Sequence, residues 1–62
     1  MKDDDLMKFG EHKGIAMANV PDEYLFWFWG ENKEEYYYSP DKMKAKDHEV
    51  MVYIEDSFED LP

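Results

Sequence analysis

Residues 20–30 read VPDEYLFWFWG, and this stretch decides the fold of the chain. Pro21 suits the first position of a helix, because its ring fixes a helical φ and its missing N–H is not needed there. Asp22 and Glu23 follow in the first turn, where the helix dipole favours carboxylates. The closing glycine is typical of a helix end. The stretch therefore predicts a short helix over about residues 21–30.

The predicted helix is apolar on nearly every side. At about 100° per residue, most of its large side chains share one arc. They are Tyr24, Leu25, Trp27 and Phe28. Phe26 points the opposite way, and Trp29 lies near the edge of the arc. Either the helix is buried on both sides, or Phe26 and Trp29 form an exposed aromatic patch.

A segment bracketed by glycines, FGEHKG at residues 9–14, precedes this helix. Short apolar runs flank it, LMKFG before and GIAMANV after, which is typical of a β-hairpin. The two glycines supply the positive φ angles that a tight turn needs. Glu11, His12 and Lys13 then lie at the solvated tip of the hairpin. Residues 1–5 are acidic and are predicted to fray.

Two other interpretations of this loop compete with a simple turn. Backbone N–H groups beside Lys13 could cradle a phosphate, but the spacing does not fit the phosphate-loop motif and Glu11 opposes an anion. His12 could hold a metal, but His48 is the only other imidazole and no spacing matches a known metal motif. A turn is therefore favoured, and neither a metal nor a cofactor is expected.

The last quarter of the chain predicts a helix, although its Val, Tyr and Ile residues favour a strand. Its apolar residues recur with a helical period. They are Val50, Met51, Ile54, Phe58 and Leu61. This helix starts near Asp41, after Ser39 as its N-cap, or near Asp47, and the sequence fits both starts. The opposite face is acidic, with Glu49, Glu55, Asp56, Glu59 and Asp60.

These elements predict an α+β fold, in which a short N-terminal β-hairpin packs on two helices, about 21–30 and about 41/47–60, in a single small domain of residues 1–62. The chain has no cysteine, which excludes a disulfide and a thiolate metal site. Its apolar runs are far shorter than the roughly 20 residues that span a membrane. Its acidic start is unlike a signal peptide, and these features together predict a cytoplasmic protein.

The net charge of −9 is unevenly distributed. Residues 47–62 carry six acids and no lysine, and the chain has no arginine, the residue best suited to bidentate phosphate contacts. A field of this sign repels nucleic acids and anionic lipids and attracts basic surfaces. An enzymatic role is not expected, because catalytic carboxylates need a cleft that shifts their pKa values, and a domain this small leaves little room for one.

The loop and the first predicted helix together resemble a known family pattern, F-G-K-x-K-G followed by an apolar run and P-x-x-Y-L-x-W-L. The matching residues are Phe9, Gly10, Lys13, Gly14, Pro21, Tyr24, Leu25 and Trp27. The pattern is that of the small family labelled "putative quorum-sensing-regulated virulence factor", which is similar to a C-terminal module of exodeoxyribonuclease-X-like exonucleases. The resemblance implies a hairpin-plus-helix core and a nucleic-acid-processing neighbourhood, but no known reaction. Glu11 stands where the family usually has lysine, and Phe26 where a polar residue is common.

The leading hypothesis is a small acidic, non-enzymatic binding protein that docks its acidic helix on a basic, nucleic-acid-handling protein. Phe26 and Trp29 would add an aromatic patch, with residues 36–38 as further candidates. Blocking nucleic-acid access, as a phage-type inhibitor that mimics nucleic acid would, is the sharpest form of this hypothesis. One alternative is an exonuclease-associated accessory module that binds nucleic acid directly. A homo-oligomer that buries the aromatic patch is another, and a merely solvated acidic face is the competing structural interpretation.

Overall fold

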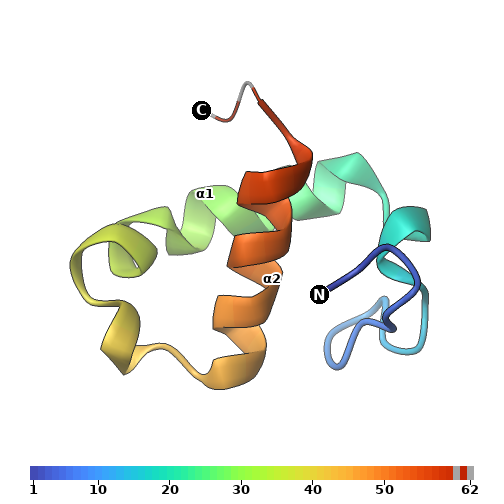
Figure 1. Ribbon diagram of the computed structural model, residues 1–62, viewed down its shortest axis with the longest axis horizontal. Helices are drawn as coiled ribbons and strands as arrows, with labels where there is room; N and C mark the ends of the chain where they lie inside the picture. The colour runs from blue at the N-terminus through green and yellow to red at the C-terminus, as the bar shows by residue number, and fades with distance from the viewer. Residues whose placement is uncertain (60, 62) are drawn as a thin grey trace.

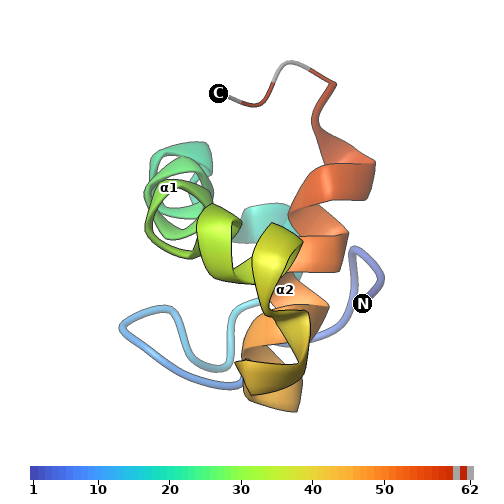
Figure 2. The same ribbon diagram turned by 90° about the vertical axis from the view of Figure 1, so that its left-hand side faces the viewer.

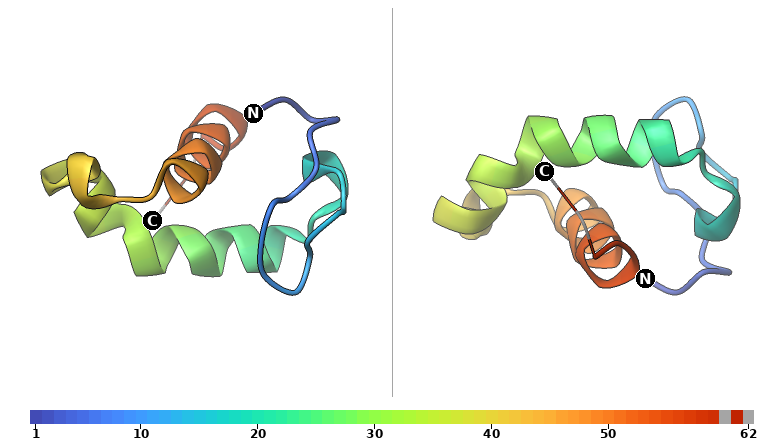
Figure 3. Two further views of the ribbon diagram at one scale, coloured as in Figure 1. Left: turned by 90° about the horizontal axis from the view of Figure 1, so that it is seen from below. Right: turned by 90° about the horizontal axis from the view of Figure 1, so that it is seen from above.

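The computed structural model describes residues 1–59 and 61, and its regular elements are all helical. In chain order they are the 3₁₀ turn η1 (Met17–Asn19), the helix α1 (Asp22–Tyr38), the 3₁₀ turn η2 (Pro40–Lys42) and the helix α2 (Ala45–Ser57). Helix α2 crosses α1 steeply, and the chain before α1 curls beside the first turns of that helix (Figures 1 and 3). The molecule is therefore a pair of crossed helices, with an irregular N-terminal segment, residues 1–20, closing one end of the pair.

The predicted α+β fold class is wrong, because the arms of the expected hairpin do not form strands. Within residues 1–59 and 61 there is no β-strand, and one isolated antiparallel bridge joins Leu6 to Ala16. Beside this bridge the Met7 N–H donates to the Ile15 carbonyl at 2.9 Å. The chain does reverse at the FGEHKG loop, but the second arm turns at once into η1, so no ladder can extend. A lone bridge between such short arms gains too little to hold a sheet.

Helix α1 begins where the sequence predicts and ends well beyond the predicted limit. It covers 17 residues, Asp22–Tyr38, and Gly30 lies inside it without a positive φ. An interior glycine costs about 1 kcal/mol relative to alanine. Four of the eight residues after Gly30 are the good helix formers Glu and Lys. The Tyr36 ring also packs against the Trp29 ring with centroids 5.9 Å apart. This packing and propensity outweigh the glycine, and the helix stops only before Pro40, as a proline requires.

The choice of helix over strand for the last segment is confirmed, although neither predicted start is correct. Residues 40–42 form the separate turn η2, and α2 spans 13 residues, Ala45–Ser57. The helix therefore ends before the predicted limit near residue 60. Glu59 lies beyond the helix, and Asp60 lies outside the described residues.

The core takes side chains from all three parts of the molecule. Its buried members are Met7, Met17 and Val20 from the N-terminal segment, Leu25, Phe28 and Trp29 from α1, and Val50, Met51, Tyr53 and Ile54 from α2. The Trp29 side chain is 1% exposed, and it is the largest of the fully buried group. Figure 2, which looks along α1, shows the N-terminal segment curling around α2 on the side away from the α1–α2 connection. Two helices and an irregular segment thus share one core.

The extreme N-terminus contacts the turn η1 and the helix α2. The Tyr53 hydroxyl donates to the Asp3 carboxylate at 2.9 Å, and the Ala18 N–H donates to the Asp3 carbonyl at 3.0 Å. Burial raises the pKa of the Tyr53 hydroxyl, and its hydrogen bond to Asp3 raises that pKa further. Lys8 adds an ion pair with Glu49 of α2 at 2.9 Å. The contacts of Tyr53 and Glu49 hold the N-terminal segment against α2, whereas the bond between Ala18 and Asp3 lies within the segment.

The two loop glycines differ in what surrounds them. Both have positive φ, +78° at Gly10 and +87° at Gly14, which other residues adopt only with strain. A Cβ on Gly10 would lie 2.8 Å from the Tyr24 hydroxyl, whereas nothing lies within 4 Å of a Cβ on Gly14. Gly10 therefore serves both the turn and the close packing of the loop on α1.

Replacing Trp29 should unfold much of the protein. Trp→Ala in a core costs about 3–5 kcal/mol, and a core of this size supplies only about 3–5 kcal/mol in total. We expect Trp29→Ala to lose most of its near-ultraviolet circular dichroism at 25 °C. Trp27→Ala is the matched control, because Trp27 is 58% exposed and its loss should cost no more than about 1.5 kcal/mol. Equal stability of the two variants would contradict this account of the core.

Substitution of the loop glycines should separate two effects on stability. One is the backbone strain of a positive φ, and the other is the steric clash of a new Cβ with Tyr24. Gly10→Ala and Gly14→Ala should each lose about 1–2 kcal/mol of unfolding free energy through the positive φ. Gly10→Ala should lose more, because its Cβ meets the Tyr24 hydroxyl. Adding Tyr24→Phe removes that oxygen and should narrow the difference. Urea denaturation of the variants measures these losses, and equal losses at the two glycines would show that Tyr24 does not pack on the loop.

Candidate functional site

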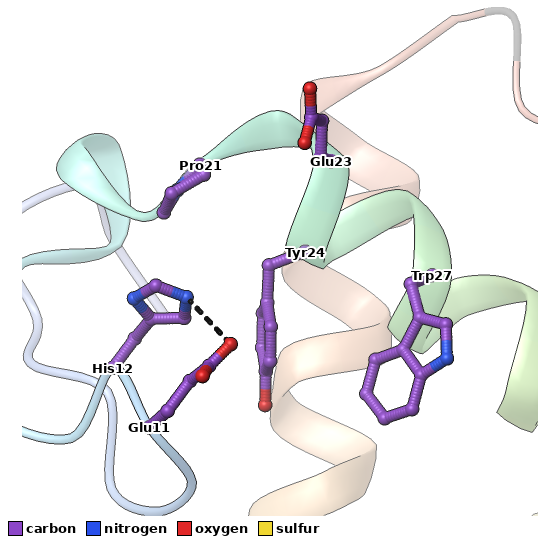
Figure 4. A pocket seen from close by; sticks show the side chains of 6 residues that line it. All are labelled: Glu11, His12, Pro21, Glu23, Tyr24 and Trp27. Carbon is purple, nitrogen blue, oxygen red and sulfur yellow. Dashed lines mark ion pairs between the residues drawn. The ribbon is translucent and has the colours of Figure 1, made fainter.

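A surface pocket lies where the FGEHKG loop meets the first turns of α1 (Figure 4). Its lining residues are Glu11, His12, Pro21, Glu23, Tyr24 and Trp27. The loop supplies the first two, and the others come from the start of α1 and the proline before it. The pocket therefore depends on the packing of the loop against the helix, which Gly10 permits.

Aromatic rings form the walls of this pocket. The His12 ring meets the Tyr24 ring edge-on with centroids 4.7 Å apart, and Tyr24 and Trp27 lie 5.6 Å apart. Figure 4 shows His12 on one side of Tyr24 and Trp27 on the other. Tyr24 is partly buried by Phe28 and the loop, whereas Trp27 exposes more than half of its surface. The pocket thus combines a fixed ring with an accessible one.

The charged groups of the pocket are carboxylates together with one imidazole. Glu11 Oε1 lies 3.5 Å from His12 Nε2, and Glu23 lies in the first turn of α1. Burial raises the pKa of the Tyr24 hydroxyl, and the nearby charges of Glu11 and Asp47 raise it further. Lys13, predicted to belong to the same loop site, is not among the lining residues. The pocket is therefore aromatic and negatively charged.

The described acids of the predicted acidic face on the second helix fall into two groups, those with a hydrogen-bond or ion-pair partner among the described residues and those exposed without one. Glu49 is paired with Lys8 of the N-terminal segment, and Glu55 accepts a hydrogen bond from the Tyr36 hydroxyl at 3.2 Å. Asp56 and Glu59 are exposed at the end of α2 and just after it. Among the described acids of this face, Asp56 and Glu59 are consequently the most available for a partner.

The predicted aromatic patch of Phe26 and Trp29 does not form, because Trp29 belongs to the core. Phe26 is 41% exposed and packs edge-on against Phe58, with ring centroids 4.8 Å apart. Phe58 lies between the exposed acids in the chain. Phe26, Asp56, Phe58 and Glu59 are called the C-terminal acidic surface below.

Sequence reasoning missed Trp27 and Tyr24 as surface groups beside the loop. Both were assigned to the buried arc of α1, and Glu11 and His12 were left at a wet tip without neighbours. A signal for their proximity was present, because the same family pattern contains both the loop and the Y-L-x-W sequence. Tyr24 and Trp27 are also three residues apart, which places them side by side on a helix.

Within residues 1–59 and 61, no three His, Cys, Asp or Glu side chains are grouped so as to hold a metal ion. In the same part of the chain, no helix has the length and apolar character that a membrane span requires.

Comparison with known proteins identifies one family. The family model described as "putative quorum-sensing-regulated virulence factor" matches residues 4–35, about half of the chain. No curated protein and no solved structure is found to match. The matched segment contains the FGEHKG loop and all six residues of the pocket, but it ends before α2. The chain belongs to the family described as "putative quorum-sensing-regulated virulence factor".

Proposed function

We propose that this protein is a small, non-enzymatic binding protein that docks on a basic surface of a nucleic-acid-handling protein in the cytoplasm. The observation that supports the proposal most strongly is how little of its negative charge is neutralised internally. The chain has 16 acids and 7 lysines, and the described residues contain a single lysine–carboxylate ion pair, Lys8–Glu49. A surface with so many uncompensated carboxylates attracts cationic partners over about one Debye length.

The C-terminal acidic surface is the main docking region in this proposal. It combines the exposed carboxylates of Asp56 and Glu59 with the Phe26–Phe58 ring pair. Apolar rings beside charges resemble the arrangement of many interfaces, in which a buried anchor is surrounded by a polar rim. Glu49 contributes less, because Lys8 already neutralises it. Blocking nucleic-acid access to the partner, as a phage-type inhibitor would, is the sharpest form of the proposal.

An accessory module that binds nucleic acid itself, as in exonuclease-like systems, is the second candidate. One observation favours it: Lys8 and Lys13 line a common surface pocket, and the Lys46 ammonium lies 5.2 Å from the ring centroid of Phe9, which follows Lys8 in the chain. Glu49 and Asp5 line the same pocket and reduce its positive charge. We therefore rank this candidate below a basic protein partner.

A pull-down from a cell lysate tests the leading proposal. The immobilised full chain should capture a basic protein at about 0.05 M salt and lose it at about 0.5 M salt, because screening shortens the reach of surface charge. Asp56→Asn with Glu59→Gln should reduce capture. Glu31→Gln with Glu34→Gln, which removes the same charge from the exposed side of α1, should reduce it less.

Failure to recover any basic protein at the lower salt concentration would contradict the proposal. A gel shift with single-stranded and double-stranded DNA under the same conditions separates the second candidate, since only an accessory module should retard the DNA. Sedimentation at several concentrations shows whether the chain forms a homo-oligomer.

A further inference from the structure

The aromatic pocket beside the FGEHKG loop has the chemistry of a cation-binding site. Trp27 presents an accessible ring, and Tyr24 is held beside it with ring centroids 5.6 Å apart. The face of an aromatic ring carries partial negative charge, and a tryptophan face attracts cations more strongly than any other side-chain ring. The two rings are therefore expected to attract a cation electrostatically.

The carboxylates of the pocket add to this attraction. Glu11 and Glu23 both line it, and neither lysine nor arginine is among its lining residues. Each carboxylate can accept charge-assisted hydrogen bonds, which are roughly twice as strong as neutral ones. The start of α1 could in principle attract an anion instead, but Asp22 and Glu23 already place two carboxylates in its first turn.

We propose that the pocket lined by Glu11, Glu23, Tyr24 and Trp27 receives an arginine side chain of a basic protein partner. The inference rests on the proposed function, and it places a second contact beside the FGEHKG loop, on residues other than those of the C-terminal acidic surface. Arginine fits better than lysine for two reasons. Its planar guanidinium stacks on aromatic faces, and its donors form a fork that matches a carboxylate. An ammonium is a compact, strongly hydrated charge that gains less from a ring.

The pocket is built before any partner arrives. The Tyr24 hydroxyl fills the space beside Gly10, and the His12 ring packs edge-on against the Tyr24 ring. A preorganised site loses less conformational entropy on binding than a mobile one. All six lining residues also lie within the segment that matches the family, whereas the C-terminal acidic surface includes residues outside it.

A nuclear magnetic resonance titration of the full chain tests this inference directly. The probe is the capped tripeptide acetyl-Gly-Arg-Gly-amide, and the readout is the indole N–H signal of each tryptophan. The Trp27 signal should shift saturably, while the signal of the buried Trp29 serves as an internal reference and should stay in place. The lysine analogue should bind at least about threefold more weakly.

Matched variants show whether the pocket or the general acidity of the protein is responsible. Glu11→Gln should weaken binding about tenfold, because it removes a charge-assisted hydrogen bond. Glu34→Gln removes the same charge from another part of α1 and should change the affinity less than about twofold. Trp27→Ala should abolish saturable shifts of the backbone signals of Tyr24 and Glu11 while the Trp29 indole signal shows that the fold is intact.

Equal weakening by Glu11→Gln and Glu34→Gln would overturn the inference, since it would mean that the peptide follows only the overall field. An equal shift of Trp27 with inorganic phosphate or with acetyl-Gly-Glu-Gly-amide would also overturn it, because the pocket would then prefer no cation. If the lysate experiment captures a basic protein while the arginine peptide leaves Trp27 unmoved, the proposed function stands and the arginine pocket does not. If the peptide binds but no basic protein is captured, the pocket stands and the proposed function fails.

Discussion

The closing of the helix pair by residues 1–20 is the constraint on which the rest of this structure depends. A chain of 62 residues without cysteine has neither a disulfide nor a thiolate metal site to stabilise it. Its two crossed helices leave core side chains open at one end, and Met7, Met17 and Val20 cover them. Methionine suits this task, because its flexible thioether fills irregular gaps between elements that are not regular themselves. The N-terminal segment is therefore part of the core and not an appendage.

The same closure creates the candidate site. Holding residues 1–20 against α1 brings the FGEHKG loop to Tyr24, and the positive φ and missing side chain of Gly10 allow the approach. Glu11 and His12 then lie against the exposed start of the helix, where Trp27 completes the pocket. The family match covers this loop–helix unit and leaves out α2. The family pattern thus describes a unit whose packing builds a surface feature, whereas the acidic charge of residues 47–62 belongs to the other part of this chain.

The sequence allowed the start of α1 to be predicted, because Pro21 and the two carboxylates after it act locally. The inward face of that helix could not be predicted while its end was placed at Gly30. In the full-length helix, Leu25, Phe28 and Trp29 share one face with Asn32 and Tyr36, which follow at helical spacings. Trp27 lies outside this face and is exposed.

The helical part of the last segment could be predicted from the period of its apolar residues. The hairpin prediction failed, because a turn signal fixes where a chain reverses but not whether its arms pair. The pocket joins loop residues to helix residues nine or more positions further along the chain, and this depends on tertiary packing that no local pattern reports.

Native-state amide hydrogen exchange tests most directly whether the N-terminal segment and the helices form one cooperative unit. The Met7 N–H donates to the Ile15 carbonyl at 2.9 Å, and the Met17 N–H donates to the Asp5 carbonyl at 2.8 Å. If the segment is part of the core, these two amides should open with the same free energy as the amide of Ile54 in α2, to within about 1 kcal/mol. Exchange of both through a much cheaper local opening, while Ile54 stays protected, would show that the helices form the core alone and that the pocket is not preformed.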